Sequence, residues 1–221
     1  MSLRSIHLRK LLKILYSDQS RRISALRSDI REDIAREQGN AEGGGDFYGP
    51  FWRDAKDHVF GFSDLTDTTR ARLEANTRRA NLYPRLHDGF LLWWNERRRW
   101  TNEPFYPADT LKAYVSIESL NSTIKIDNIL AVRDAHGEDH FVYPYFSPEP
   151  ILNEEAARLG LWILQQGFPT VPVACFRVLD VMRGITFNID RNPLRGDESD
   201  ILLRRYSSAL DESDQLRIEY S

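Results

Sequence analysis

The strongest constraint on the fold is a change in hydrophobic periodicity near Pro104 and Pro107. Before these prolines, apolar residues recur at spacings of three and four, which is typical of amphipathic helices. After them, apolar and polar residues alternate, which is typical of strands with one buried face. We therefore expect an α+β protein, in which an N-terminal helical region packs on a C-terminal mixed sheet flanked by two helices.

The helical half opens with two apolar stripes, from Leu8 to Leu15 and from Ile23 to Ile34. Each stripe has the spacing of one helix face. The glycine-rich segment 39–46 that follows is expected to be a linker. Three more helices are predicted, so that residues 1–105 are expected to be wholly helical. These three further helices are predicted to cover residues 50–59, 67–80 and 84–100.

The second half is predicted to be mostly strands. A hairpin is expected around the turn at 134–139, and Pro144 predicts that its returning strand is an edge or ends there, because proline lacks a ladder donor. The predicted strands are 113–118, 129–133, 141–146, 176–181, 185–189 and a terminal 216–220, and the predicted helices are 154–166 and 198–210. The expected domains are a helical arm with its linker (1–45), a helical region (46–107) and an α+β domain (108–221).

Charge is distributed unevenly. Residues 1–110 carry 19 Lys and Arg against 16 Asp and Glu, whereas residues 111–221 carry 11 against 17. This asymmetry would suit a nucleic acid or an acidic partner placed against the first half. The single Cys175 excludes an internal disulfide and predicts a reducing, cytoplasmic setting. No apolar run approaches the roughly 20 residues that span a bilayer, so no membrane contact is expected.

The order of elements over about residues 113–190 resembles the restriction-endonuclease-like fold, in particular RecB-type members of the PD-(D/E)XK family. Asp127, after Ile126, resembles that family's first metal-binding acid. The family carries an acid and a lysine on the returning strand, to hold a divalent cation and activate water. Here Tyr143 and Tyr145 supply neither group, so the resemblance implies a nuclease-like core without its catalytic residues. The chain as a whole also resembles an uncharacterised bacterial protein family, which implies no activity.

Two alternative metal sets remain open. The first is Glu118 with Asp127, as the nuclease resemblance implies. The second is His58, His87 and Asp88, whose order resembles that of the HD-type metal phosphohydrolases. The simpler interpretation of His87 and Asp88 is a surface pair on a helix.

His136 and His140 bracket a turn, and the acids between and beside them are expected to be turn formers and solvated charges. They are Asp134, Glu138 and Asp139.

The run Arg97, Arg98 and Arg99, followed by Trp100, is the best candidate for a binding site. Arginines that contact phosphates beside a stacking aromatic ring are what single-stranded nucleic-acid grooves require. The alternative is that three arginines only complement a helix C-terminus. Arg78 and Arg79 lie in the same helical half and are included as contact residues. Tyr143 and Tyr145, on the predicted edge strand, are included as well.

These observations predict a non-catalytic intracellular binding or regulatory protein that contacts nucleic acid or a protein partner and has no cofactor. The alternative is a metal-dependent phosphodiesterase or nuclease that uses one of the two metal sets. A further expectation is a homo-oligomer formed through the N-terminal helices, because apolar helix faces that are not covered internally seek a partner.

Overall fold

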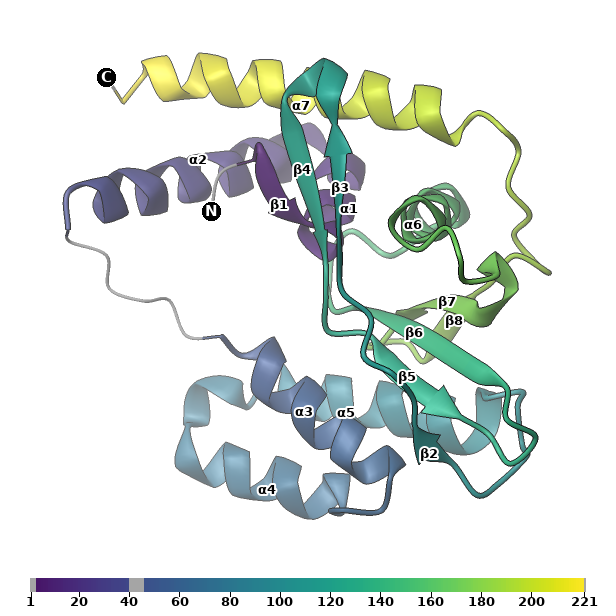
Figure 1. The fold of residues 1–221 in the computed structure, drawn as a ribbon. Coiled ribbons are helices and arrows are strands. Elements are labelled where there is room, and N and C mark those ends of the chain that lie inside the picture. Colours follow the sequence, from purple (N-terminus) through teal and green to yellow (C-terminus); the bar gives the residue numbers. More distant parts are fainter. Residues whose placement is uncertain (1–2, 40–45, 221) are drawn as a thin grey trace.

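The computed structural model describes residues 3–39 and 46–220 and has the expected α+β class (Figure 1). The predicted linker lies outside the described residues, apart from Gly39 and Asp46. The α-helices are α1 (Leu8–Tyr16), α2 (Gln19–Glu37), α3 (Tyr48–Val59), α4 (Leu65–Ala75), α5 (Tyr83–Leu92), α6 (Glu154–Gly167) and α7 (Glu198–Ile218).

The strands form two sheets. One has five strands in the order β2-β5-β6-β7-β8, and the other has three in the order β1-β4-β3. Their bounds are β1 (Ser5–His7), β2 (Tyr106–Pro107), β3 (Ala113–Ile117), β4 (Ser122–Ile126), β5 (Leu130–Arg133), β6 (Asp139–Tyr145), β7 (Phe176–Asp180) and β8 (Ile185–Phe187).

Strand β6 is central, so the expectation that it forms an edge is wrong. It pairs antiparallel with β5, which confirms the hairpin, and parallel with β7. Pro144 is tolerated because the ladder with β5 ends at Val142, so Pro144 has a strand neighbour on one side only, opposite Leu179.

The five-stranded sheet separates two hydrophobic cores, because its strands alternate apolar residues between both faces. From β6, Tyr143 and Tyr145 enter the core shared with α1, α6 and α7, whereas Val142 enters the core shared with α3 and α5. Figure 1 shows α3, α4 and α5 together on one side of this sheet, with α1, α6 and α7 on the other. The sheet is therefore covered on both faces.

Tyr143 and Tyr145 are consequently not surface contact residues, and that prediction is wrong. Each is only 1% exposed. The Tyr143 hydroxyl accepts a hydrogen bond from the backbone N–H of Arg9 at 2.8 Å, and the Tyr145 hydroxyl donates to the carbonyl of Pro150 at 2.8 Å. Both rings stabilise the core and are hydrogen-bonded there, as buried tyrosines usually are.

The N-terminal half is not wholly helical, because β1 pairs parallel with β4. A strand of three residues is too short to show a period, and neither β1 nor β4 was expected. The apolar stripes of α1 and α2 are buried in the same core as α6 and α7. They are covered within the chain, so the reason for expecting oligomers through them is removed. The proposed division into residues 1–45, 46–107 and 108–221 stays a prediction, and this packing crosses its first boundary.

The C-terminal segment is one continuous helix. α7 extends to Ile218, so the terminal strand predicted at 216–220 is wrong. Helix α7 lies beside α2 (Figure 1), and Arg22 of α2 forms a bidentate ion pair with Glu212 of α7 at 2.6 and 2.7 Å. Two further pairs, Arg27 with Glu219 and Arg217 with Glu37, join the same helices. We call this set of cross-helix pairs the α2–α7 seam.

Candidate anion-binding site

A cavity of about 580 Å³ lies between the end of α5 and the turn that joins β7 to β8. Five arginines and two carboxylates line it, which gives the lining an excess of positive charge. The arginines are Arg97, Arg98, Arg99, Arg177 and Arg191, and the acids are Glu96 and Asp190. We call this cavity the basic pocket.

One wall of the basic pocket is a π-helical turn, η2 (Trp93–Arg97), which continues α5. The N–H of Arg98 reaches back to the carbonyl of Trp93 at 2.7 Å, a spacing of five residues. Single π turns inside helices are frequent at functional sites. The π turn changes the backbone direction just before Arg98 and Arg99. It ends at Arg98, whose backbone is extended.

Two glycines let α5 approach the β7–β8 turn closely. A Cβ atom on Gly89 would overlap the carbonyl oxygen of Val181, and one on Gly184 would press against the carbonyl of Gly89. Gly184 also has φ of +59°, a conformation that glycine adopts readily. These contacts hold η2 against the β7–β8 turn, and so they set the shape of the pocket.

Arg97 and Arg98 have different environments. Arg97 donates from Nη1 to the carbonyls of Arg183 and Gly184, at 3.0 and 3.2 Å, and remains exposed. Arg98 is packed over the rings of Trp94 and Phe105, at 3.9 and 4.4 Å from their centroids, and pairs with Glu103 at 2.9 Å. Burial lowers the pKa of the Arg98 guanidinium. Arg98 therefore has a structural role in the aromatic cluster.

The remaining arginines of the basic pocket have no carboxylate partner within the described part of the chain. Arg99 and Arg191 are exposed. Arg177, on β7, is half-buried and donates from Nη1 to the carbonyl of Cys175 at 3.1 Å. Burial lowers the pKa of Arg177. Asp190 acts against this shift, but no carboxylate forms an ion pair with Arg177 in the described residues. A desolvated cation without a direct ion pair is costly, so Arg177 favours an anionic ligand.

Trp100 does not provide the expected stacking platform. Its side chain is 7% exposed, and its ring is stacked on His140 with centroids 4.4 Å apart. Its edges pack against Trp93, Trp94 and Phe105. His140 thus covers one face of this ring, so Trp100 is not an open stacking platform. Trp100 still lines the basic pocket, and its direct contact with a ligand stays a prediction.

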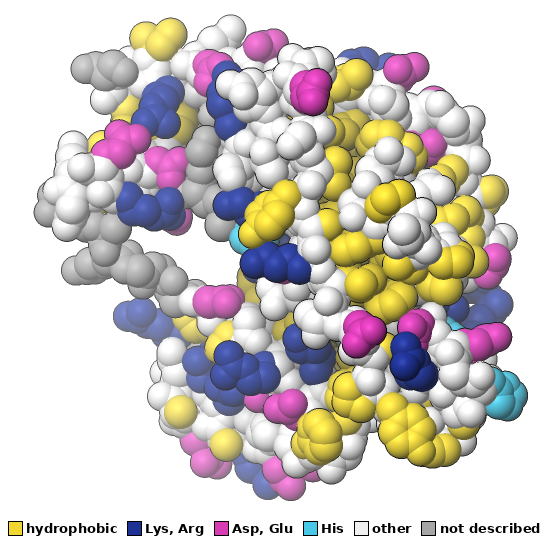
Figure 2. Space-filling model, viewed as in Figure 1, with side chains coloured by type: hydrophobic (Ala, Val, Ile, Leu, Met, Phe, Trp, Pro, Cys, Tyr) yellow, Lys and Arg dark blue, Asp and Glu magenta, His cyan; other side chains and the backbone are white. Residues whose placement is uncertain are grey.

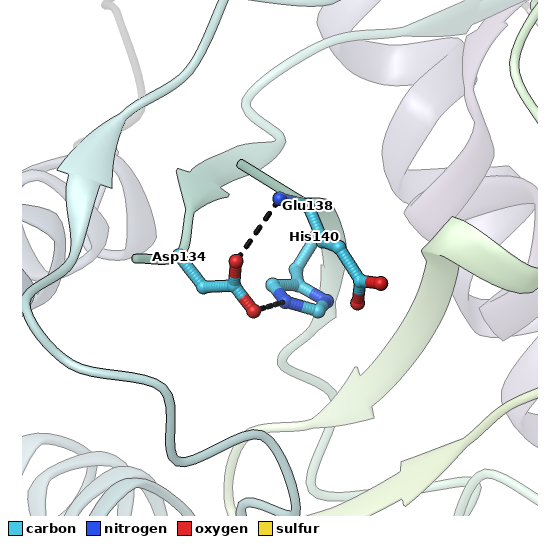
Figure 3. A group of neighbouring side chains, drawn as sticks. All are labelled: Asp134, Glu138 and His140. Atoms are coloured by element: carbon cyan, nitrogen blue, oxygen red, sulfur yellow. Dashed lines mark hydrogen bonds and ion pairs between the residues drawn. The ribbon is translucent and has the colours of Figure 1, made fainter. Parts of the chain in front are cut away.

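Behind Trp100 lies the one group of three potential metal ligands found among residues 3–39 and 46–220. Asp134, Glu138 and His140 have ligand atoms within 4.8 Å of one another (Figure 3). In that view the His140 ring lies between the two carboxylates. Asp134 is 2% exposed, whereas Glu138 is on the surface.

The hydrogen bonds of Asp134 identify this group as a turn stabiliser. Its Oδ1 accepts from the backbone N–H of His136 and Glu138, at 2.9 and 3.0 Å. Its Oδ2 lies 3.1 Å from Asn102 Nδ2 and 3.3 Å from His140 Nε2. Burial alone would raise the pKa of Asp134, but these four hydrogen bonds hold it well below its usual range. Both carboxylate oxygens are already used, in agreement with the expected turn-forming role.

The two alternative metal sets do not converge. Glu118 and Asp127 lie at opposite ends of the β3–β4 hairpin, since Ile117 pairs with Ser122 and Ala113 with Ile126. Asp127 is instead paired with His7, whose Nδ1 is 3.1 Å from its Oδ1.

His58 and His87 bond to neighbouring residues of α4. The Nδ1 of His58 accepts from the N–H of Leu65, and the Nε2 of His87 is 3.1 Å from the Thr66 hydroxyl. His87 also contacts Asp88, whose side chain is 78% exposed. These contacts fix the start of α4 and agree with the interpretation of His87 and Asp88 as a surface pair.

Arg78 and Arg79 do not join the basic pocket lining. Arg79 donates to the carbonyl of Arg72 at 3.1 Å and lies over the rings of Phe47 and Tyr83. Arg78 is exposed. The arginine run at 97–99 is thus the part of the predicted surface that the structure places in a cavity. Arg177 and Arg191 complete it, and no sequence signal marks them, because each is a lone arginine far along the chain.

Comparison of the chain with protein-family models, with curated proteins and with solved structures finds no match. Within the described ranges, no helix has the length and apolar character needed to cross a bilayer. The site must therefore be interpreted from its own chemistry.

Proposed function

We propose that this chain is a non-catalytic binding protein, whose basic pocket takes the phosphate groups of a nucleic acid. The observation that carries the proposal is the contrast in arginine pairing. Four arginines that line the pocket lack a carboxylate partner within the described residues, whereas the arginines of the α2–α7 seam each have one. Guanidinium groups match phosphate oxygens in geometry and charge.

The dimensions of the pocket support a ligand of nucleotide size. A volume of about 580 Å³ falls within the roughly 300–1,000 Å³ of small-ligand sites. Because Trp100 is covered, recognition would rest on the phosphate rather than on base stacking. We therefore expect binding that is independent of sequence and strongly dependent on salt. The proposed setting is the cytoplasm, supported by the free and half-buried Cys175.

The test is binding of a fluorescently labelled single-stranded DNA oligonucleotide, measured by anisotropy. We expect the logarithm of the affinity to fall with the logarithm of salt concentration, with a slope of about −3 if four phosphates are neutralised. The double variant Arg99→Glu/Arg191→Glu should weaken binding on the order of a hundredfold. Both residues are exposed, so the fold should be kept.

The matched control is Arg204→Glu, an exposed arginine of α7 that forms no ion pair with any described residue. It changes the net charge by the same amount per site and should change affinity less than twofold. Competition with inorganic pyrophosphate tests whether phosphate alone is recognised. If the oligonucleotide does not bind, or binds the double variant as tightly as the native chain, the proposal is wrong.

A further inference from the structure

Strand β3 is an edge with one side unpaired. It is the last strand in the order β1-β4-β3, and β4 is its only paired strand among the described residues. Its sequence, Ala-Tyr-Val-Ser-Ile, contains no charge and no proline. Natural proteins usually protect an edge with such residues, because free backbone N–H and C=O groups attract another strand. An unprotected edge of five residues is therefore a candidate pairing surface.

The two faces of β3 differ in burial. Ala113, Val115 and Ile117 are half-buried on the side of the core, where Gly167 of α6 lies beside Ala113 and Val115. Tyr114 and Ser116 are exposed, and Tyr114 is 59% exposed. Figure 2 shows apolar side chains gathered on the surface beside β3 and over α6. A strand added at this edge would continue the alternation and cover part of this apolar surface.

The charges that flank β3 specify what kind of strand would fit. Lys112 precedes the strand and Glu118 follows it, and both are exposed. Neither forms an ion pair with any other residue in 3–39 or 46–220, and the Nζ of Lys112 lies 5.6 Å from the centroid of the Tyr114 ring. Lys112 and Glu118 stand three residues before and three residues after Val115. Opposite charges therefore lie at equal distances on the two sides of Val115.

We infer that β3 pairs antiparallel with β3 of a second copy of this chain, centred on Val115. A twofold axis at that point places Lys112 of each copy opposite Glu118 of the other, so both ends of the pair have complementary charges. Tyr114 then lies opposite Ser116 of the second copy. The two three-stranded sheets join into one sheet of six strands. The charge complementarity selects a second copy over an unrelated peptide as the occupant.

Analytical ultracentrifugation tests this dimer. The native chain should be a dimer, and Lys112→Glu and Glu118→Lys should each raise its dissociation constant on the order of tenfold, because each places like charges opposite each other twice. An equimolar mixture of the two variants should restore the native affinity, because every cross-strand pair in the mixed dimer is again Lys with Glu. Circular dichroism of each variant checks that its fold is kept.

The control is Arg204→Glu, which should leave the dissociation constant unchanged. A native chain that is monomeric at every concentration tested would overturn the inference. So would a dimer that neither single variant weakens, or a mixture that associates no more tightly than its components. None of these outcomes depends on ligand binding in the basic pocket, so the dimer and the proposed function can fail separately.

Discussion

The α2–α7 seam and the basic pocket are both rich in arginine, but they use it differently. In the seam, Arg22 meets Glu212 with two hydrogen bonds, and the pair holds two helices together. In the basic pocket, Arg177 is half-buried, donates to a carbonyl and lies over the Trp100 ring, and no carboxylate of the described residues forms an ion pair with it. The comparison teaches that pairing, and not the number of arginines, separates a structural surface from a candidate binding surface.

The largest expected effect is on the wall that shapes the pocket. Gly89→Ala should lower the free energy of unfolding by about 3 kcal/mol, because its Cβ would overlap the Val181 carbonyl and push α5 away from the β7–β8 turn. Urea denaturation measures the loss. Gly160→Ala is the matched control, because Gly160 also lies within a helix and a Cβ there would meet only the side-chain ends of Leu12 and Val178, at 3.3 Å. Equal losses in both variants would show that the close contact at Gly89 is unimportant.

Breaking a pair in the seam should affect stability alone. Arg22→Met removes both hydrogen bonds to Glu212, whose side chain is 25% exposed, and should cost about 1 kcal/mol of unfolding free energy. Oligonucleotide affinity should stay within twofold of the native value. A large loss of affinity would mean that the seam belongs to the binding surface, which would remove the distinction between the two regions.

Removing an unpaired arginine from the pocket should have the opposite effect on stability. Arg177→Met keeps an unbranched apolar stem and removes a desolvated cation, so the unfolding free energy should rise by about 1 kcal/mol. Affinity for the oligonucleotide should fall about tenfold. Thermal denaturation and anisotropy on the same samples measure both. A destabilised Arg177→Met variant would argue that Arg177 is structural.

The buried Asp134 and His140 behind Trp100 predict that the stability of the fold is sensitive to acid. Burial lowers the pKa of His140, so the unfolded chain binds more protons near pH 6.5 and stability falls as the pH drops through that value. The pKa of Asp134 is also lowered, so a second loss follows below about pH 4. His140→Gln should remove the first loss, as measured by urea denaturation from pH 7.5 to 5.5. An unchanged profile would contradict this assignment.

The smallest effect is expected at Arg78, which is exposed and forms no ion pair with any described residue. Arg78→Glu should change stability by less than about 0.5 kcal/mol. Oligonucleotide affinity should fall less than threefold, because Arg78 does not line the basic pocket. A loss comparable to that of the Arg99→Glu/Arg191→Glu variant would extend the binding surface along the helical half.

Capping and turn residues correctly predicted the helices and hairpins that depend on residues close together in the sequence. The helix at 154–166 begins after Asn153, whose side chain caps it as expected, and the hairpin of β5 and β6 follows its turn residues. Long-range pairing was not predictable in this way. Strand β1 is three residues long and is held by β4, which is more than a hundred residues away. Likewise, Pro144 predicts an edge, but the ends of neighbouring strands decide where a proline is tolerated.

The candidate site could be predicted only where it is contiguous. The run Arg97 to Arg99 is visible in the sequence, but Arg177 and Arg191 join it through the packing of β7 and β8 against α5. The burial of Trp100 by His140 was not visible either, because no spacing links residues forty positions apart. Asp134 was correctly interpreted as a turn former, but the expectation that its charge is solvated is wrong, because Asp134 is 2% exposed and both of its oxygens are hydrogen-bonded.

The most direct test of the contrast is NMR of the arginine Nε–Hε groups during titration with inorganic pyrophosphate. We predict that the resonances of Arg97, Arg99, Arg177 and Arg191 shift together and saturate, whereas that of Arg22 stays in place. Equal shifts in both regions, or shifts confined to the α2–α7 seam, would contradict the assignment of the basic pocket as an anion site.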